Sequence, residues 1–256
     1  MITTGMVSAT FREKPAEDII RLCVENRLSA VEWSENAHVL PDDPQGAALL
    51  RQKTEDAGLK IAAYGSYYRL GENENPAETF QKSLVSAKAL GAPVIRIWAG
   101  KKPSAEVGEE EFSRLAAEAS LIAGLAEQAG IQAAFEWHKN TLTDTNESAI
   151  RLLALAAHPN LYCLWQPTDA LTMEQRKQGL HWLSQNGRLL NLHVYYWPDG
   201  TRHPLAEGLA VWKDYLSQID ITEDRYALIE FVRGNTEQQL ADDAQAINRL
   251  AAEVNP

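Results

Sequence analysis

The sequence predicts a (β/α)8 barrel, the TIM-barrel class of α/β fold, in a single domain. Eight short apolar runs recur roughly every 30 residues along a chain of 256, which is the size and period of such a barrel. Segments with helical periodicity fill the gaps between the runs. At three boundaries a glycine ends the helical segment and an apolar run follows at once.

The eight apolar runs are the predicted strands. Each is short and bounded by turn residues, as expected of a strand buried in a parallel sheet. The clearest follow Gly58, Gly91 and Gly130, because glycine readily takes the left-handed conformation in which many helices end. The runs begin near Ile2, Ala30, Leu59, Pro93, Ile131, Leu161, Leu189 and Tyr226.

The segments between the runs predict helices. Residues 76–90 and 111–126 repeat apolar side chains at spacings of three and four residues. Thr145 is the expected N-cap of a helix over residues 147–157, and Pro15 suits the first turn of the first helix. The sequence holds neither a phosphate-binding glycine motif nor a linker or break in composition. One domain over residues 1–256 follows.

Composition narrows the class of partner. The 24 basic and 35 acidic side chains give a net charge of −11, which opposes nucleic-acid binding because phosphate contacts dominate that affinity. Neither a membrane-spanning apolar run nor a signal peptide is expected. Cys23 and Cys163 lie in apolar stretches and are expected to be buried thiols. We therefore expect a cytoplasmic protein that acts on a small molecule, as a monomer or a homo-oligomer.

Polar residues end four consecutive apolar runs, where a (β/α)8 barrel builds its active site. These residues are Glu136, Gln166, His193 and Glu230. A charged side chain at the end of a buried strand is costly unless it is paired or binds a metal. Two carboxylates, an amide oxygen and an imidazole suit Mn²⁺, Mg²⁺ or Co²⁺, with Zn²⁺ as an alternative.

Each of these residues also has a simpler interpretation. A histidine in a strand is more often a hydrogen-bonded core residue, and glutamine is a poor metal ligand. Strand-end carboxylates also pair with arginines such as Arg96 or Arg233. The coincidence on four consecutive strands is what favours a metal site. Five tryptophans at strand ends, Trp98 among them, either stack on a sugar or cap the barrel.

At these residues the chain resembles the xylose isomerase-like superfamily of sugar phosphate isomerases and epimerases, which also includes endonuclease IV. The resemblance spans about residues 2–252. It implies a divalent metal held at the positions of the family's Glu, Asp, His and Glu, which are Glu136, Gln166, His193 and Glu230. The family's E-x-H motif appears as Glu136-Trp137-His138, and its run after strand seven as His193, Arg202, Pro204 and Gly208.

The sequence departs from the family pattern on strand six. The family's Asp is Gln166 here, so the D-x-x-H motif of ketose epimerases becomes Gln166-Pro167-Thr168-Asp169. The loss of a carboxylate is expected to lower metal affinity or change the preferred metal. The missing imidazole removes a usual substrate contact, which Asp169, His138 or His203 would replace.

The resemblance implies a metal-dependent sugar isomerase or epimerase that acts on a small ketose, aldose or sugar acid. The metal would stabilise an enediolate while the catalytic residues Glu136 and Glu230 remove and return the proton. The candidate substrate-binding residues are His38, His138, Asp169, Arg202, His203 and Trp98.

Three alternatives to this activity stay open. A metal-dependent lyase or dehydratase would start from the same enediolate and expel a β-hydroxyl, with His138 or His203 as the acid. A metal-free protein on this scaffold would bind a sugar without turning it over. A DNA-repair endonuclease is opposed by the net charge.

Overall fold

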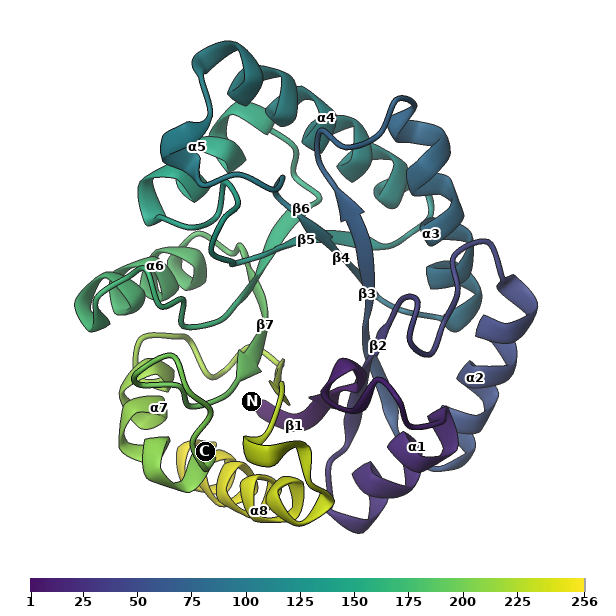
Figure 1. The fold of residues 1–256 in the computed structure, drawn as a ribbon, viewed down its shortest axis with the longest axis vertical. Helices are drawn as coiled ribbons and strands as arrows, with labels where there is room; N and C mark the ends of the chain where they lie inside the picture. Colours follow the sequence, from purple (N-terminus) through teal and green to yellow (C-terminus); the bar gives the residue numbers. More distant parts are fainter. Residues whose placement is uncertain (256) are drawn as a thin grey trace.

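Parallel strands close into a barrel in the computed structural model, which describes residues 1–255. The strands pair in sequence order, and the last pairs back with the first. Figure 1 looks along the barrel, with the helices around its outside. The strands are Ile2–Val7 (β1), Ala30–Ser34 (β2), Lys60–Arg69 (β3), Val94–Trp98 (β4), Gln132–Glu136 (β5), Leu161–Trp165 (β6), Leu189–Val194 (β7) and Arg225–Ile229 (β8). The predicted fold is confirmed, and each predicted strand start lies within one residue of the observed one.

A helix follows each strand. The helices are Ala16–Glu25 (α1), Pro44–Asp56 (α2), Pro76–Leu90 (α3), Glu109–Gln128 (α4), Asn146–Ala156 (α5), Met173–Gln185 (α6), Leu209–Leu216 (α7) and Glu237–Val254 (α8). Thr145 caps α5 as predicted, because its side chain accepts a hydrogen bond from the Ser148 backbone N–H. Pro15 precedes the first helical residue instead of lying inside the helix, since its ψ of 159° is extended. No helix within residues 1–255 is long and apolar enough to cross a membrane.

One large apolar core and two smaller apolar clusters contain side chains of the strands. The main core contains Trp33, Trp137 and Trp165, which are buried and therefore neither stack on a ligand nor cap the barrel. Two smaller clusters lie apart from this core and include Ala30, Val94, Ala134, Leu164 and Leu228. Each of these five residues comes two positions before a polar residue that lies in the same strand or directly after it. Because side chains alternate along a strand, those polar residues share the face of the small clusters and continue it towards the strand ends.

Candidate active site

Three of the four predicted metal ligands meet at the ends of their strands. Glu136 ends β5, His193 lies in β7 and Glu230 directly follows β8, and all three side chains are buried. The distance from His193 Nδ1 is 3.5 Å to Glu230 Oε2 and 3.8 Å to Glu136 Oε1. One potential ligand atom from each residue lies within 4.8 Å of the other two. These residues form the metal-ligand group described below.

The fourth predicted ligand lies beside the same carboxylate. Gln166 is buried after β6, and its Nε2 donates a hydrogen bond to Glu136 Oε1 over 3.1 Å. A half turn of the amide about its last bond would present Oε1 in the same direction, and the oxygen is the amide atom that binds cations. Gln166 is therefore placed to join the metal-ligand group.

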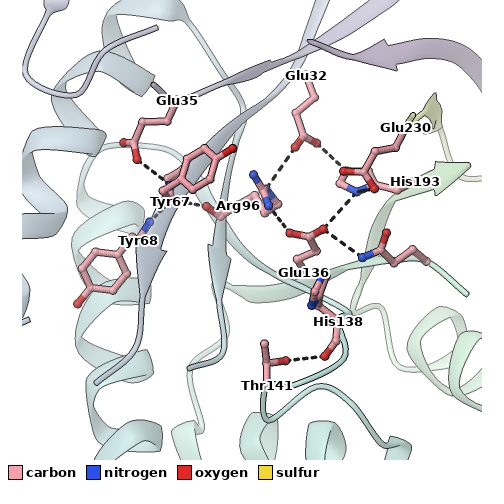
Figure 2. Close-up of polar contacts among 12 residues, drawn as sticks. Glu32, Glu35, Tyr67, Tyr68, Arg96, Glu136, His138, Thr141, His193 and Glu230 are labelled. Atoms are coloured by element: carbon pink, nitrogen blue, oxygen red, sulfur yellow. Dashed lines mark hydrogen bonds and ion pairs between the residues drawn. The ribbon is translucent and has the colours of Figure 1, made fainter. Parts of the chain in front are cut away.

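Two further buried residues, Glu32 and Arg96, hold this group together (Figure 2). His193 Nε2 lies 2.9 Å from Glu32 Oε2. The Arg96 guanidinium pairs with Glu136 and lies 3.3 Å from Glu32 Oε1. Neither residue was selected from the sequence as a site residue, although each lies two residues after a member of the small apolar clusters, as Glu136 does. The sequence also allowed a simpler role for Glu136, an ion pair with Arg96. This ion pair is present.

The buried charges favour a divalent cation. Glu32, Glu136 and Glu230 outnumber Arg96 and a protonated His193 by one negative charge, and by two when the imidazole is neutral, as a metal ligand must be. Burial alone would raise the pKa of Glu136, yet Arg96 and His193 hold it well below its usual range. Burial likewise opposes protonation of His193, but the charges of Glu32 and Glu230 raise its pKa well above the ordinary value.

His193 provides the test of whether a metal fits. Its Nε2 faces Glu32, whereas its buried Nδ1 has no hydrogen-bond partner among residues 1–255 and faces Glu136 and Glu230. An imidazole nitrogen without a partner, beside two carboxylates, is a ligand set suited to Mn²⁺, Co²⁺ or Zn²⁺. The residues present therefore fit a divalent cation.

A pocket of about 210 Å³ opens onto the metal-ligand group, and Glu136, Gln166 and Glu230 line it. Three of the six predicted substrate contacts, Trp98, His138 and Asp169, also line it. The rings of His138 and Trp98 lie 4.5 Å apart between centroids.

The other three predicted substrate contacts lie outside the pocket lining. His38 Nε2 is 3.0 Å from the carbonyl oxygen of Lys14, which lies in the segment before α1. Arg202 donates to Asn235 Oδ1 over 2.5 Å, and its Cζ lies 4.6 Å from the centroid of the pocket-lining Phe231 ring. His203 faces Glu207 in the loop that follows β7. Each side chain is held by a partner that the sequence pattern did not reveal.

The pocket also contains residues that sequence reasoning missed. These residues are Arg12, Tyr67, Lys139, Tyr195 and Phe231. Tyr67 lies two residues before the end of β3, and the other four lie beyond strand ends. Of these five residues, only Phe231 had a sequence pattern that could have marked it as a pocket residue, because it directly follows the strand-end carboxylate Glu230.

Residues 20–250 match the model of the Xylose isomerase-like TIM barrel family. The chain belongs to this family. The family match and the buried Glu–His–Glu group together indicate a metal-using enzyme of the xylose isomerase-like class.

Proteins similar to this chain carry different activities. A 3-dehydroshikimate dehydratase from Bacillus anthracis is 25% identical, over 93% of this chain and 92% of that protein. Among solved structures, the probable 3-DHS dehydratase AsbF from Bacillus anthracis has a TM-score of 0.80 at 20% identity, covering 97% of this chain and 99% of that one. An L-ribulose 3-epimerase has a TM-score of 0.73 at 15% identity, covering 99% and 95%. The structural likenesses show a shared fold.

Proposed function

We propose that this protein is a metal-dependent dehydratase that removes water from a small β-hydroxy ketone carrying a carboxylate, with 3-dehydroshikimate as the first candidate. The observation that carries the proposal is the inequality of the two predicted catalytic carboxylates. Glu136 pairs with Arg96 and accepts from Gln166, and its pKa is held low. Glu230 lines the pocket and faces only His193 among these groups.

This inequality disfavours epimerisation. An epimerase removes a proton from one face of a carbon and returns one to the other, so both groups must exchange protons readily. A carboxylate paired with a buried guanidinium is a weak base. Dehydration needs only one group that exchanges protons readily, because the proton that this group takes from carbon can be delivered to the departing hydroxyl. The relationship to a 3-dehydroshikimate dehydratase supports the same choice.

Glu136, His193 and Glu230, joined by Gln166, would hold the metal, and a bound divalent ion would supply Lewis-acid stabilisation of negative charge on the substrate oxygen. His138 is the proposed base. Its Nδ1 lies 2.6 Å from the Lys139 carbonyl oxygen, so Nδ1 carries the hydrogen and Nε2 remains the basic nitrogen. The packing against Trp98 fixes the ring on the pocket wall.

The imidazole of His138 carries out both proton transfers of the proposed reaction. His138 Nε2 takes the hydrogen from the carbon next to the ketone, and the electron pair of that C–H bond forms the enolate. The enolate then expels the hydroxyl of the neighbouring carbon, which leaves as water with the proton returned by His138. Loss of one water from 3-dehydroshikimate, followed by tautomerisation, gives 3,4-dihydroxybenzoate.

The test is an assay of the purified protein with 3-dehydroshikimate and Mn²⁺, Mg²⁺, Co²⁺ or Zn²⁺, with the product identified by mass spectrometry. We expect 3,4-dihydroxybenzoate, no product after chelation, and no product from His138→Gln that still binds the metal. L-Ribulose in D₂O is the comparison substrate. Deuterium uptake by the ketose without dehydration of 3-dehydroshikimate would instead establish the epimerase expected from the family resemblance. Chelator-insensitive sugar binding without turnover would establish the metal-free alternative.

A further inference from the structure

The cationic side chains that line the pocket are not equivalent. Arg96 lies between Glu32 and Glu136, and Lys139 Nζ is 3.5 Å from Asp169 Oδ2. Arg12 also lines the pocket, but among residues 1–255 no carboxylate oxygen lies within 4.0 Å of its nitrogens. Arg12 is therefore the cation of this pocket whose charge the protein leaves unbalanced.

Aromatic rings flank Arg12. Its Cζ atom lies 5.9 Å from the centroid of Tyr67 and 6.0 Å from that of Phe231, and both rings line the pocket. Aromatic faces attract a guanidinium, but they do not satisfy its directional N–H donors. The two rings can therefore orient Arg12 while leaving its donors available to an oxygen ligand.

A hydrogen bond connects the chain near Arg12 to the segment that follows Glu230. Phe231, the residue after Glu230, has a φ of 55°, a conformation that aromatic residues rarely adopt. Its N–H donates to Thr10 Oγ1 over 3.0 Å, and Thr10 is two residues before Arg12. This bond links the loop after β8 to the short 3-10 helix Ser8–Phe11 that follows β1. Strained residues held in this way cluster at binding sites, where they place a side chain.

We propose that Arg12 is an anion subsite that binds the carboxylate of the substrate and selects acids over neutral analogues. The proposal rests on the proposed function for the identity of the acid. A guanidinium forms paired hydrogen bonds with a carboxylate. Arg96 and Lys139 already pair with Glu136 and Asp169, so an acidic substrate needs a cation of the pocket that is not already neutralised, and Arg12 is such a cation.

The experiment compares two probes that share a catechol ring: 3,4-dihydroxybenzoate and its neutral amide, 3,4-dihydroxybenzamide. Binding to the Mn²⁺-loaded protein is measured by calorimetry. We expect Arg12→Gln to weaken binding of the acid about tenfold or more and to leave binding of the amide unchanged, as expected for a charged hydrogen-bonding contact. Arg12→Lys should keep part of the preference, because it retains the charge without the planar donors.

Lys139→Gln is the matched control, because it removes the same charge from the same pocket but from a residue already paired with Asp169. We expect it to change the preference for the acid far less than Arg12→Gln does. Equal weakening of both probes by Arg12→Gln, an equal effect of Lys139→Gln, or no preference for the acid in the wild type would overturn the proposal. Arg12 is exposed, so the variant is expected to fold, and thermal unfolding checks this.

The outcomes for the subsite and for the proposed function are distinguishable, since probe binding requires no turnover. If the protein binds the acid through Arg12 but does not dehydrate 3-dehydroshikimate, the proposed function is wrong and the proposed subsite stands. If Arg12→Gln dehydrates 3-dehydroshikimate as well as the wild type does, the proposed function stands and the proposed subsite is wrong.

Discussion

The carboxylate of Glu32 is fully buried and contacts two other residues of the site. One oxygen lies 2.9 Å from His193 Nε2, and the other lies 3.3 Å from Arg96 Nε. In the neutral imidazole that a metal ligand requires, Glu32 would hold the hydrogen on Nε2, and the lone pair of Nδ1 would face the metal-ligand group. Carboxylates that accept from a metal-binding histidine commonly fix its orientation in this way.

We expect Glu32→Gln to lower metal affinity about 10- to 100-fold, because an amide can donate to Nε2 as well as accept from it. Competition with a chelating dye measures the affinity. Glu35→Gln is the matched control: Glu35 is a buried carboxylate just beyond the same strand, but it accepts from Tyr64 and Ser83 instead. An equal loss of affinity in both variants would show that Glu32 acts only through general stability.

Gln166→Glu tests the departure on strand six. The change keeps the shape of the side chain but replaces a donor to Glu136 with a second negative charge, 3.1 Å away in the present arrangement. We expect the melting temperature to fall in the presence of chelator and to recover on addition of Mn²⁺ by more than the wild type gains. Differential scanning calorimetry with and without metal provides both values. A loss that Mn²⁺ does not reverse would place residue 166 outside the metal site.

The two cysteines are expected to be unreactive in the folded protein. Burial raises the pKa of Cys23 and Cys163 to about 12, so both remain protonated near neutral pH as well as inaccessible. A thiol reagent such as DTNB should label neither in buffer at pH 8 and both in guanidinium chloride. Rapid labelling of either one under native conditions would show that its helix or strand opens locally.

At the scale of elements, α4 and the turn after it hold two glycines with opposite requirements. Gly130 has a φ of 76°, and an added Cβ would meet nothing within 4 Å. Gly124 lies inside the helix, where an added Cβ would make ordinary contact at 3.5 Å.

We expect Gly130→Ala to lower the free energy of unfolding by about 1 kcal/mol, because alanine is strained in the left-handed conformation. Gly124→Ala should raise it by about 1 kcal/mol, since glycine weakens a helix interior. Urea denaturation of the two variants gives both values. A change of the same sign in the two would contradict this explanation.

Elements also divide what could be predicted from what could not. Glycine stops and apolar runs located the strands, and the polar residues at the ends of those runs identified Glu136, Gln166 and Glu230. Glu32 was not selected, although alternation along β2 places it on the same face as these residues. Loops were less predictable, because their side chains follow tertiary partners. Strand β3 extends to Arg69, and a hydrogen bond from the Tyr67 N–H to Glu35 holds that extension.

For the whole molecule, closure of the barrel is what assembles the site. Glu32 and His193 are 161 residues apart in sequence, and their strands β2 and β7 are not neighbours in the sheet. They meet only because the strands surround a common interior. The metal-ligand group therefore exists only in the folded chain, and a bound metal should stabilise the whole domain.

We expect saturating Mn²⁺ to raise the melting temperature of the wild type, by about 2–4 °C for each kcal/mol of binding free energy gained. Glu230→Gln, which lacks one ligand carboxylate, should show little of this shift. Elemental analysis of both proteins, purified without a histidine tag, supplies the matching stoichiometry. Equal shifts in the two proteins would mean that the cation binds elsewhere.

The closed sheet also bears on how this protein can change over evolution. Every strand has two hydrogen-bonded neighbours, so the frame that carries the metal-ligand group has no free edge to protect. Arg12, Lys139 and Asp169, by contrast, lie in loops beyond the strands. Substitutions in these loops can alter which substrate is accepted while the frame and the metal ligands stay in place. Selection can therefore act on substrate choice and on metal chemistry separately.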